Sequence, residues 1–284
     1  MDKEKAAGAI LRTREAYKNY TIKTAADIKY VDTSYGPVRV LEYGFDTDEI
    51  RPLYVSVHGG GYCVGSPEMD EQICLRIMKE AGVKIISIDY PKAPENPYPI
   101  GLEASYEVVR HYYNNSDVHR IDKENIGIGG YSSGGNFATV IPIKAKERKD
   151  LKIRYQMLCY PGTNISIDPY SKKGSDKILS KEFLEVIHVC YISRHEHAYE
   201  PYASPQLAPK EMLAGLPPAL LILGDIDPLY EEGIGYGNNL KAAGVDVETH
   251  VFKDADHGFA SYKETDDKKR AEDLIVDFIE RHSR

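Results

Sequence analysis

The chain has 284 residues, a length suited to one large α/β domain or two small ones. Its 36 Lys and Arg residues against 44 Asp and Glu residues give a formal net charge of −8. This acidic balance argues against nucleic-acid binding, which needs a basic face, and no segment has the apolar length of a membrane span.

The N-terminal segment and the cysteines indicate a reducing compartment. The apolar residues from Ala6 to Leu11 are too few and too mixed for the core of a signal peptide, so we expect a cytoplasmic location. The cysteines are widely spaced, form no C-x-x-C pair and give no sign of a disulfide framework or a zinc site. We expect buried thiols at all four positions, which are Cys63, Cys74, Cys159 and Cys190.

Eight segments have the apolar or alternating pattern of β-strands. In chain order they are residues 28–32, 38–43, 53–58, 83–89, 125–130, 153–160, 218–224 and 245–252. The first two alternate as half-buried antiparallel strands do, whereas the third is more apolar and is predicted to be central.

Helical patterns separate most of these strands. The predicted helices cover residues 1–25, 68–81, 101–115, 137–148, 230–243 and 267–281. Residues 91–99 hold four prolines and are predicted to be irregular. Residues 161–215 lack strand periodicity and contain one helical stretch near 181–192, which is typical of an insertion.

From residue 53 onward, strands and helices alternate, and this pattern predicts a mostly parallel eight-stranded sheet with helices on both faces. We expect a single domain over residues 1–284, with a helical cap formed by about 1–25 and an insertion at about 161–215. In such sheets, ligands bind outside the carboxyl ends of the strands.

A serine motif lies at one of those strand ends. Gly130-Tyr131-Ser132-Ser133-Gly134 fits G-x-S-x-G, between a short apolar strand and a segment that can be helical. A serine on such a turn is held in a strained backbone with its hydroxyl exposed, and the flanking glycines avoid a Cβ clash. The pattern predicts Ser132 as an activated nucleophile.

A serine hydroxyl needs a base to take its proton and a carboxylate to orient that base. His257 follows the strand at 245–252 and is favoured over the eight other histidines because its loop matches the required order of Ser, acid and His. Asp225 and Asp227 both follow the strand at 218–224 and compete for the acid. The rigid turn before Pro228 favours Asp227, but spacing alone does not separate the two.

A fourth element follows the strand at 53–58 and reads His58-Gly59-Gly60-Gly61. Its glycines can turn backbone N–H groups toward a developing oxyanion, together with the N–H of the residue after the nucleophile, Ser133. A phosphate-binding loop is the alternative, but neither of its two glycine patterns is present.

Together these motifs resemble those of the hormone-sensitive-lipase-like esterases of the α/β-hydrolase fold, particularly the bacterial acetyl esterase and carboxylesterase branch. The resemblance extends over roughly residues 36–282. It rests on the glycine loop, the serine turn and three short segments, Asp89-Tyr90-Pro91-Lys92-Ala93-Pro94-Glu95, Asp227-Pro228-Leu229 and His257-Gly258-Phe259.

The resemblance implies Ser132 as nucleophile, His257 as base and Asp227 rather than Asp225 as the acid. It also implies that Gly60, Gly61 and Ser133 supply the oxyanion N–H groups, that His58 supports the glycine loop, and that the N-terminal helix and the insertion cover the acyl site.

The chain departs from the family pattern at two places. Tyr131 stands where the family has an acid before the serine, and its role is unexplained. Pro91 and Lys92 replace the usual Arg and Leu. Neither change removes a catalytic group, but both bear on the shape of the pocket.

The sequence therefore predicts a serine carboxylic-ester hydrolase acting on small, soluble, short-acyl esters, with no cofactor and no metal. It predicts neither a nucleic-acid nor a membrane partner and leaves a homodimer open. Two alternatives remain: an amide or peptide hydrolase with the same triad, such as an arylformamidase or small peptidase, and a non-catalytic small-molecule receptor on the same fold.

Overall fold

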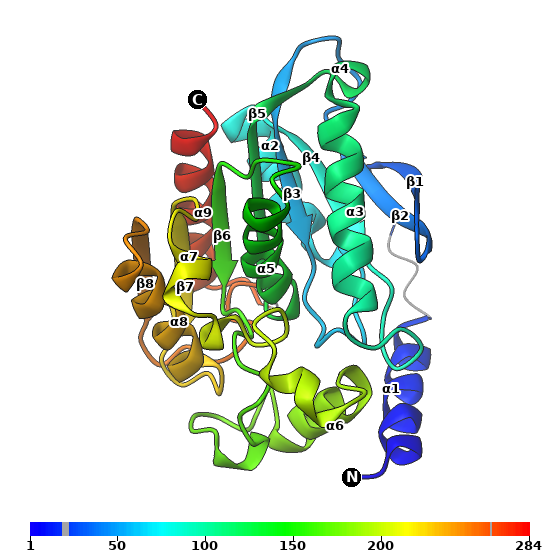
Figure 1. The fold of residues 1–284 in the computed structure, drawn as a ribbon, viewed down its shortest axis with the longest axis vertical. Coiled ribbons are helices and arrows are strands. Elements are labelled where there is room, and N and C mark those ends of the chain that lie inside the picture. The colour runs from blue at the N-terminus through cyan, green and yellow to red at the C-terminus, as the bar shows by residue number, and fades with distance from the viewer. Residues whose placement is uncertain (19–22, 262) are drawn as a thin grey trace.

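The structure is a computed structural model that describes residues 1–18, 23–261 and 263–284. A twisted sheet runs through the centre of the molecule, with helices on both of its faces (Figure 1). The predicted α/β-hydrolase architecture, with eight strands, is confirmed. Part of the helix predicted for residues 1–25 lies outside the described residues.

The strands occupy the predicted places with small shifts at their ends. Their bounds are β1 Asp27–Thr33, β2 Gly36–Tyr43, β3 Arg51–Val57, β4 Lys84–Asp89, β5 Ile121–Tyr131, β6 Tyr155–Cys159, β7 Ala219–Gly224 and β8 Val247–Phe252. Their order across the sheet is β1-β2-β4-β3-β5-β6-β7-β8. β2 is antiparallel to both β1 and β4, and the remaining neighbours pair in parallel, as expected for a mostly parallel sheet.

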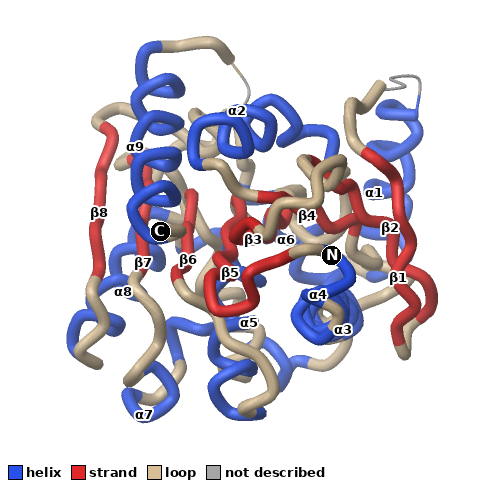
Figure 2. Tube along the Cα trace, turned by 90° about the horizontal axis from the view of Figure 1, so that it is seen from above, coloured by secondary structure: helices blue, strands red, loops and turns tan. Residues whose placement is uncertain are grey.

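The α-helices of the described chain are α1 Lys3–Lys18, α2 Glu71–Ala81, α3 Ile100–Asn114, α4 Ser116–His119, α5 Ser133–Arg148, α6 Lys181–Tyr191, α7 Lys210–Leu213, α8 Tyr230–Ala242 and α9 Asp266–His282. Seen from above, α2 and α9 cover one face of the sheet, and α3, α5 and α8 cover the other (Figure 2). The central strands β6 and β7 are fully buried, which explains their unbroken apolar sequences.

The insertion and the N-terminal helix lie beyond the carboxyl ends of the parallel strands (Figure 1). There α6 packs beside α1, and the insertion contains no strand within residues 161–215, as predicted. The insertion also contains three short 3₁₀ turns, η2 Pro169–Ser171, η3 His195–Tyr199 and η4 Pro205–Leu207. A fourth, η1 Pro67–Asp70, precedes α2.

One predicted boundary was wrong in a way that matters for the site. The sequence placed the start of α5 at Phe137, because the preceding glycines and Asn136 are poor helix formers. The helix instead begins at Ser133, directly after the predicted nucleophile. Tertiary packing overrides propensity here, since Gly134 lies against the backbone at the end of β3 and Gly135 lies against Pro161.

Close backbone packing at Gly134 is the tightest of these contacts. A Cβ added to Gly134 would lie 2.0 Å from the carbonyl oxygen of Val57, at the end of β3. We expect Gly134→Ala to lower the free energy of unfolding by more than about 2 kcal/mol, because rigid backbone must move to relieve the overlap.

Gly8→Ala is the matched control for this substitution, measured by urea and thermal unfolding. Gly8 lies in α1 and a Cβ there would meet only the Arg12 side chain, at 3.4 Å. Alanine should leave stability unchanged or raise it by up to about 1 kcal/mol. Equal behaviour of the two variants would contradict the packing described for Gly134.

Candidate active site

Ser132 occupies a sharp turn between β5 and α5. Its backbone has φ 53° and ψ −115°, a region that a residue with a side chain rarely adopts. The turn is held by hydrogen bonds at both ends of the residue. The Ser132 N–H donates to the carbonyl of Cys159 at 3.0 Å, and its own carbonyl accepts from the N–H groups of Asn136 and Gly162, each at 3.1 Å.

Glycines are required on both sides of this turn. A Cβ on Gly130 would lie 2.4 Å from the carbonyl carbon of Gly134, so the two ends of the turn nearly touch. The turn places Ser132 at the end of the sheet, directly before the N-terminus of α5. Unpaired N–H groups and the helix dipole favour negative charge there.

The three residues predicted as nucleophile, base and acid form one hydrogen-bonded chain. Ser132 Oγ lies 2.9 Å from His257 Nε2, and His257 Nδ1 lies 2.8 Å from Asp227 Oδ2. His257 and Asp227 are both buried, which strengthens their interaction relative to water. The arrangement can pass a proton from the serine to the imidazole while the carboxylate steadies the imidazolium.

The two rival aspartates have separate partners. Besides His257, Asp227 accepts the N–H of Leu229 at 2.7 Å. Asp225 accepts the N–H of Asp254 at 2.6 Å and so links the loop after β7 to the loop that carries His257. Among the histidines, His188 also lines the cavity, but its Nδ1 bonds the carbonyl of Ile165 at 3.1 Å.

The glycine loop folds back on itself beside the serine turn. Gly60 has φ +123° and Gly61 φ +59°, and the carbonyl of Gly60 accepts the N–H groups of Cys63 and Val64. No hydrogen bond between described residues uses the N–H of Gly60 or of Gly61. These donors and the N–H of Ser133 border the same cavity as Ser132.

His58 is fully buried beneath the glycine loop. Its Nδ1 donates to the carbonyl of Gly59 at 2.6 Å, and its ring stacks on Tyr90 with centroids 4.3 Å apart. Burial lowers the pKa of His58 to about 3, so the ring is neutral. Tyr90 in turn donates to the carbonyl of His58 at 3.2 Å, which ties the loop to the segment after β4.

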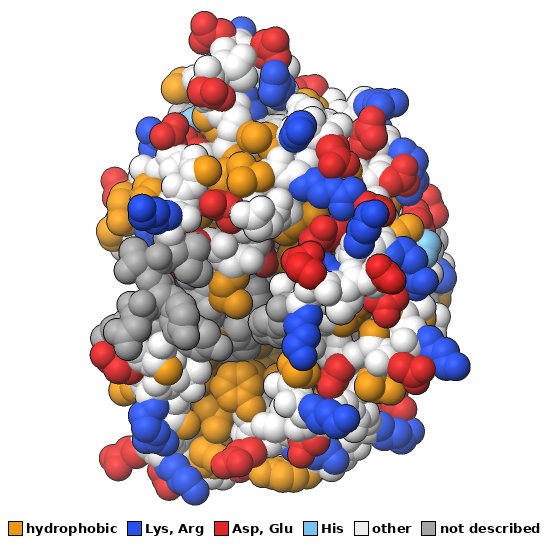
Figure 3. All heavy atoms as spheres, turned by 180° about the vertical axis from the view of Figure 1, so that it is seen from behind, with side chains coloured by type: hydrophobic (Ala, Val, Ile, Leu, Met, Phe, Trp, Pro, Cys, Tyr) orange, Lys and Arg blue, Asp and Glu red, His pale blue; other side chains and the backbone are white. Residues whose placement is uncertain are grey.

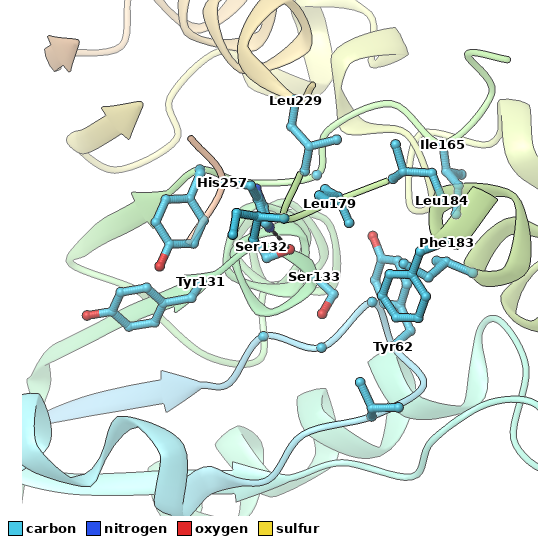
Figure 4. Close-up of a pocket in the computed structure, with 18 of the residues that line it drawn as sticks. Tyr62, Tyr131, Ser132, Ser133, Ile165, Leu179, Phe183, Leu184, Leu229 and His257 are labelled. Atoms are coloured by element: carbon cyan, nitrogen blue, oxygen red, sulfur yellow. Dashed lines mark hydrogen bonds between the residues drawn. The ribbon is translucent and has the colours of Figure 1, made fainter. Parts of the chain in front are cut away.

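A cavity of about 570 Å³ opens around Ser132 and His257. Figure 4 shows Ile165, Leu184 and Phe183 on one side of the serine and Tyr131 on the other. The three residues of the first side are apolar and come from the insertion, which includes α6. Met69, Asp70, Tyr160 and Ser261 also line the cavity.

The insertion and α1 are fastened to the glycine loop at several points. The ring of Tyr62 stacks on that of Tyr191 in α6, with centroids 3.8 Å apart and planes 3° from parallel. Arg14 of α1 donates to the carbonyl of Cys63 at 2.7 Å. Within the insertion, Lys172 pairs with the buried Glu232 of α8.

Sequence reasoning missed Asp70, which borders the cavity from the start of α2. Its side chain is only 6% exposed, and burial alone raises its pKa to about 7. Three acids stand within four positions at this point of the chain, Glu68, Asp70 and Glu71, so no local signal separates the one that borders the cavity.

The surface agrees with the composition. On the face seen from behind, acidic and basic side chains are interspersed (Figure 3). No helix in the described part of the chain is long and apolar enough to cross a membrane. The described residues also contain no group of three or more His, Cys, Asp or Glu side chains arranged to hold a metal ion.

An α/β-hydrolase sheet with this hydrogen-bonded chain at its strand ends defines the class of serine hydrolases. Comparison with known proteins agrees with this class. A family model described as the alpha/beta hydrolase fold matches residues 54–261. The chain belongs to this family, in its hormone-sensitive-lipase-like branch.

Individual relatives are named esterases. The esterase LipI of Mycobacterium tuberculosis is 31% identical over 82% of this chain and 74% of its own length. The carboxylic ester hydrolase LipN of the same organism is 33% identical over 73% of this chain, which spans only 57% of LipN. The solved esterase of Pyrobaculum calidifontis matches with a TM-score of 0.85 and 29% identity, over 99% of this chain and 94% of that one.

The raised pKa of Asp70 has a consequence for stability. A carboxyl that holds its proton more tightly in the folded than in the unfolded protein makes the free energy of unfolding fall as the pH rises, here between about 4 and 7. The amide of Asp70→Asn does not titrate, so the variant lacks this fall in the free energy of unfolding. The stability of the variant relative to the wild type should therefore increase between pH 5 and 8, by on the order of 2 kcal/mol.

Urea unfolding of both proteins at the two pH values measures this difference. Every other titrating group is common to both proteins. The effect of Asp70 is therefore the change, between the two pH values, in the difference between their free energies of unfolding. A difference that stays constant with pH would show that Asp70 is not a buried, unpaired acid.

Proposed function

We propose that the protein hydrolyses carboxylic esters through an acyl-enzyme on Ser132. The observation that carries this proposal is the chain from Ser132 Oγ through His257 to Asp227, with links of 2.9 and 2.8 Å. Membership of a family whose relatives are named esterases and carboxylic ester hydrolases supports it.

In the first half of the reaction, Ser132 Oγ attacks the ester carbonyl while His257 Nε2 takes the hydroxyl proton. The carbonyl oxygen becomes an oxyanion, and the N–H groups of Gly60, Gly61 and Ser133 stabilise it, each contributing up to about 3 kcal/mol. The tetrahedral species collapses, the C–O bond to the alcohol breaks, and His257 returns its proton to the leaving alkoxide.

In the second half, water attacks the acyl-serine and His257 accepts one of its protons. The acid product leaves as Ser132 regains its proton. Asp227 keeps its charge throughout, since its role is to hold the Nδ1–H tautomer and offset the charge of the imidazolium. His58, neutral and buried, positions the glycine loop and takes no part in proton transfer.

Small esters with short acyl groups fit this site best. The cavity of about 570 Å³ lies beneath α1 and the insertion, and charged residues such as Lys172 and Lys177 border it. We propose that about 1–25 and about 161–215 form the cap of this single domain, with residues 19–22 outside the described chain. A cytoplasmic location remains a prediction from the sequence, which leaves a homodimer open.

The two alternatives lack a supporting observation. A non-catalytic receptor would not need the complete chain of serine, histidine and acid. An amide or peptide hydrolase would use the same residues, but the relatives carry ester-hydrolase names. Rates on an ester and the matching anilide measure this preference directly.

Substitutions at the two aspartates test the triad. We expect Asp227→Asn to lower kcat by about 10³- to 10⁴-fold, because the amide favours the wrong tautomer of His257. Asp225→Asn is the matched control, since Asp225 bonds a backbone N–H and not the imidazole. It should lose less than about tenfold in kcat.

Hydrolysis of 4-nitrophenyl acetate and covalent labelling by a fluorophosphonate are the measurements, with Ser132→Ala as the unreactive reference. Labelling of Ser132→Ala at the wild-type rate would place the nucleophile elsewhere. Similar losses in the two aspartate variants would refute Asp227 as the orienting acid.

Acyl-chain preference tests the substrate class. Across 4-nitrophenyl esters from acetate to laurate, kcat/KM should fall by at least about tenfold beyond hexanoate, because charged residues such as Lys172 and Lys177 border the cavity and disfavour a long apolar chain. Concentrations are kept below those at which the long esters form micelles. A maximum at laurate would contradict the proposed preference.

A further inference from the structure

The strongest unexplained feature of the cavity is the carboxyl group of Asp70. Five acids of the described chain are buried: Glu42, Asp70, Glu71, Asp227 and Glu232. Four of them have donors. Tyr112 donates to Glu42, Tyr43 to Glu71, His257 to Asp227, and Lys172 to Glu232. Asp70 Oδ2 has no hydrogen-bond partner among the described residues.

A helix cap does not account for the position of Asp70. The residue ends η1, which runs directly into α2, and its backbone (φ −101°, ψ 7°) is not the extended conformation in which an aspartate side chain caps a helix by accepting an N–H. Its side chain makes no such bond. The chain therefore keeps a carboxyl group buried at the cavity instead of using it to cap the helix.

No cation of the described chain compensates this carboxyl group. Burial is the only cause that raises its pKa, to about 7, and no neighbouring Lys, Arg or His lowers it. A buried charge is costly unless it is paired. A ligand that brought a positive charge to Asp70 would recover that cost, so the site is suited to a cation.

Aromatic rings complete this end of the cavity. Tyr131 and Tyr160 border it with their ring centroids 5.9 Å apart, and the Tyr160 hydroxyl is hydrogen-bonded to Ser261 Oγ at 2.6 Å. Burial, and after it the nearby Cys159 and Asp70, raise the pKa of the Tyr131 phenol. Aromatic faces attract alkylammonium groups, most strongly where water is excluded.

We propose that Asp70, Tyr131 and Tyr160 form a subsite that binds an alkylammonium group on one half of the ester substrate. We call these three residues the Asp70 subsite, and Tyr131 of this subsite lies across Ser132 from the apolar side formed by Ile165, Phe183 and Leu184 (Figure 4). The other half of the ester occupies that apolar side. The inference rests on the proposed ester hydrolysis and narrows its substrate class. It also gives Tyr131 a function.

Two pairs of isosteric esters test the subsite, because each pair differs only in charge. For the alcohol half they are 2-(trimethylammonio)ethyl acetate and 3,3-dimethylbutyl acetate. For the acyl half they are methyl 4-(trimethylammonio)butanoate and methyl 5,5-dimethylhexanoate. Acid release is followed by titration at about pH 8, above the raised pKa of Asp70, where the carboxyl group is ionised.

The readout is the ratio of kcat/KM for the charged ester to that for its neutral isostere. In the wild type we expect at least one pair to favour the charged ester by about tenfold. In Asp70→Asn, which keeps the shape and removes the charge, that ratio should fall to about one or below. Glu71→Gln is the matched control and should keep the wild-type ratio, because Glu71 bonds Tyr43 and Ala25 rather than bordering the cavity.

Direct binding gives a second measurement that needs no turnover. By calorimetry, choline should bind the wild type about tenfold more tightly than 3,3-dimethylbutan-1-ol does, and Asp70→Asn should abolish that difference. Equal ratios and equal binding in the wild type and Asp70→Asn would overturn the subsite and leave Asp70 as a structural acid. If Asp70→Asn does not fold, the wild type alone decides. The subsite is overturned if the wild type prefers neither the charged esters over their neutral isosteres nor choline over 3,3-dimethylbutan-1-ol.

Failure of the proposed function is distinguishable from failure of the subsite. A wild type that hydrolyses none of the four esters and no 4-nitrophenyl acetate refutes the esterase, whereas the calorimetric comparison still decides the subsite. A wild type that hydrolyses neutral and charged esters at ratios insensitive to Asp70→Asn refutes only the subsite.

Discussion

The contact between the serine turn and the end of β3 is the constraint on which the rest of the structure depends. Ser132 can hold φ 53° only because Gly130 and Gly134 let three backbone segments approach within distances that no Cβ would permit. A residue in so unfavourable a conformation costs about 1–3 kcal/mol and persists only where its surroundings over-determine it. The same approach brings the glycine loop, which follows β3, alongside Ser132.

The other loops of the site are held by hydrogen bonds from residues to which we assign no catalytic role. Asp225 joins the loop after β7, which carries Asp227, to the loop after β8, which carries His257. His58 and Tyr90 support the glycine loop from below. Neighbouring residues therefore fix the loops at the strand ends in place. Electrostatic stabilisation of a transition state requires donors that are preorganised in this way.

Much of this could be predicted from the sequence, because strand ends and catalytic motifs coincide in it. Ser132 follows an apolar strand, and His257 follows a strand in which apolar and polar residues alternate. Each lies in a recognisable motif, so periodicity and motif agreed. Asp225 and Asp227 could not be separated by spacing, since the direction in which each carboxylate points depends on the fold of a turn. Asp70 escaped notice because its burial arises from packing between segments far apart in the chain.

The fit between the glycine loop and α6 has a consequence for how this enzyme can change. A Cβ on Gly61 would lie 2.3 Å from Ile187, and the neighbouring Tyr62 lies flat on Tyr191. The helix that helps shape the pocket thus rests directly on the loop that would stabilise the oxyanion. Substitutions on α6 that are selected to admit a new substrate can therefore displace the glycine loop and lower kcat. Directed evolution of specificity is less constrained at Leu179 and Ile165, which line the cavity from parts of the insertion outside α6.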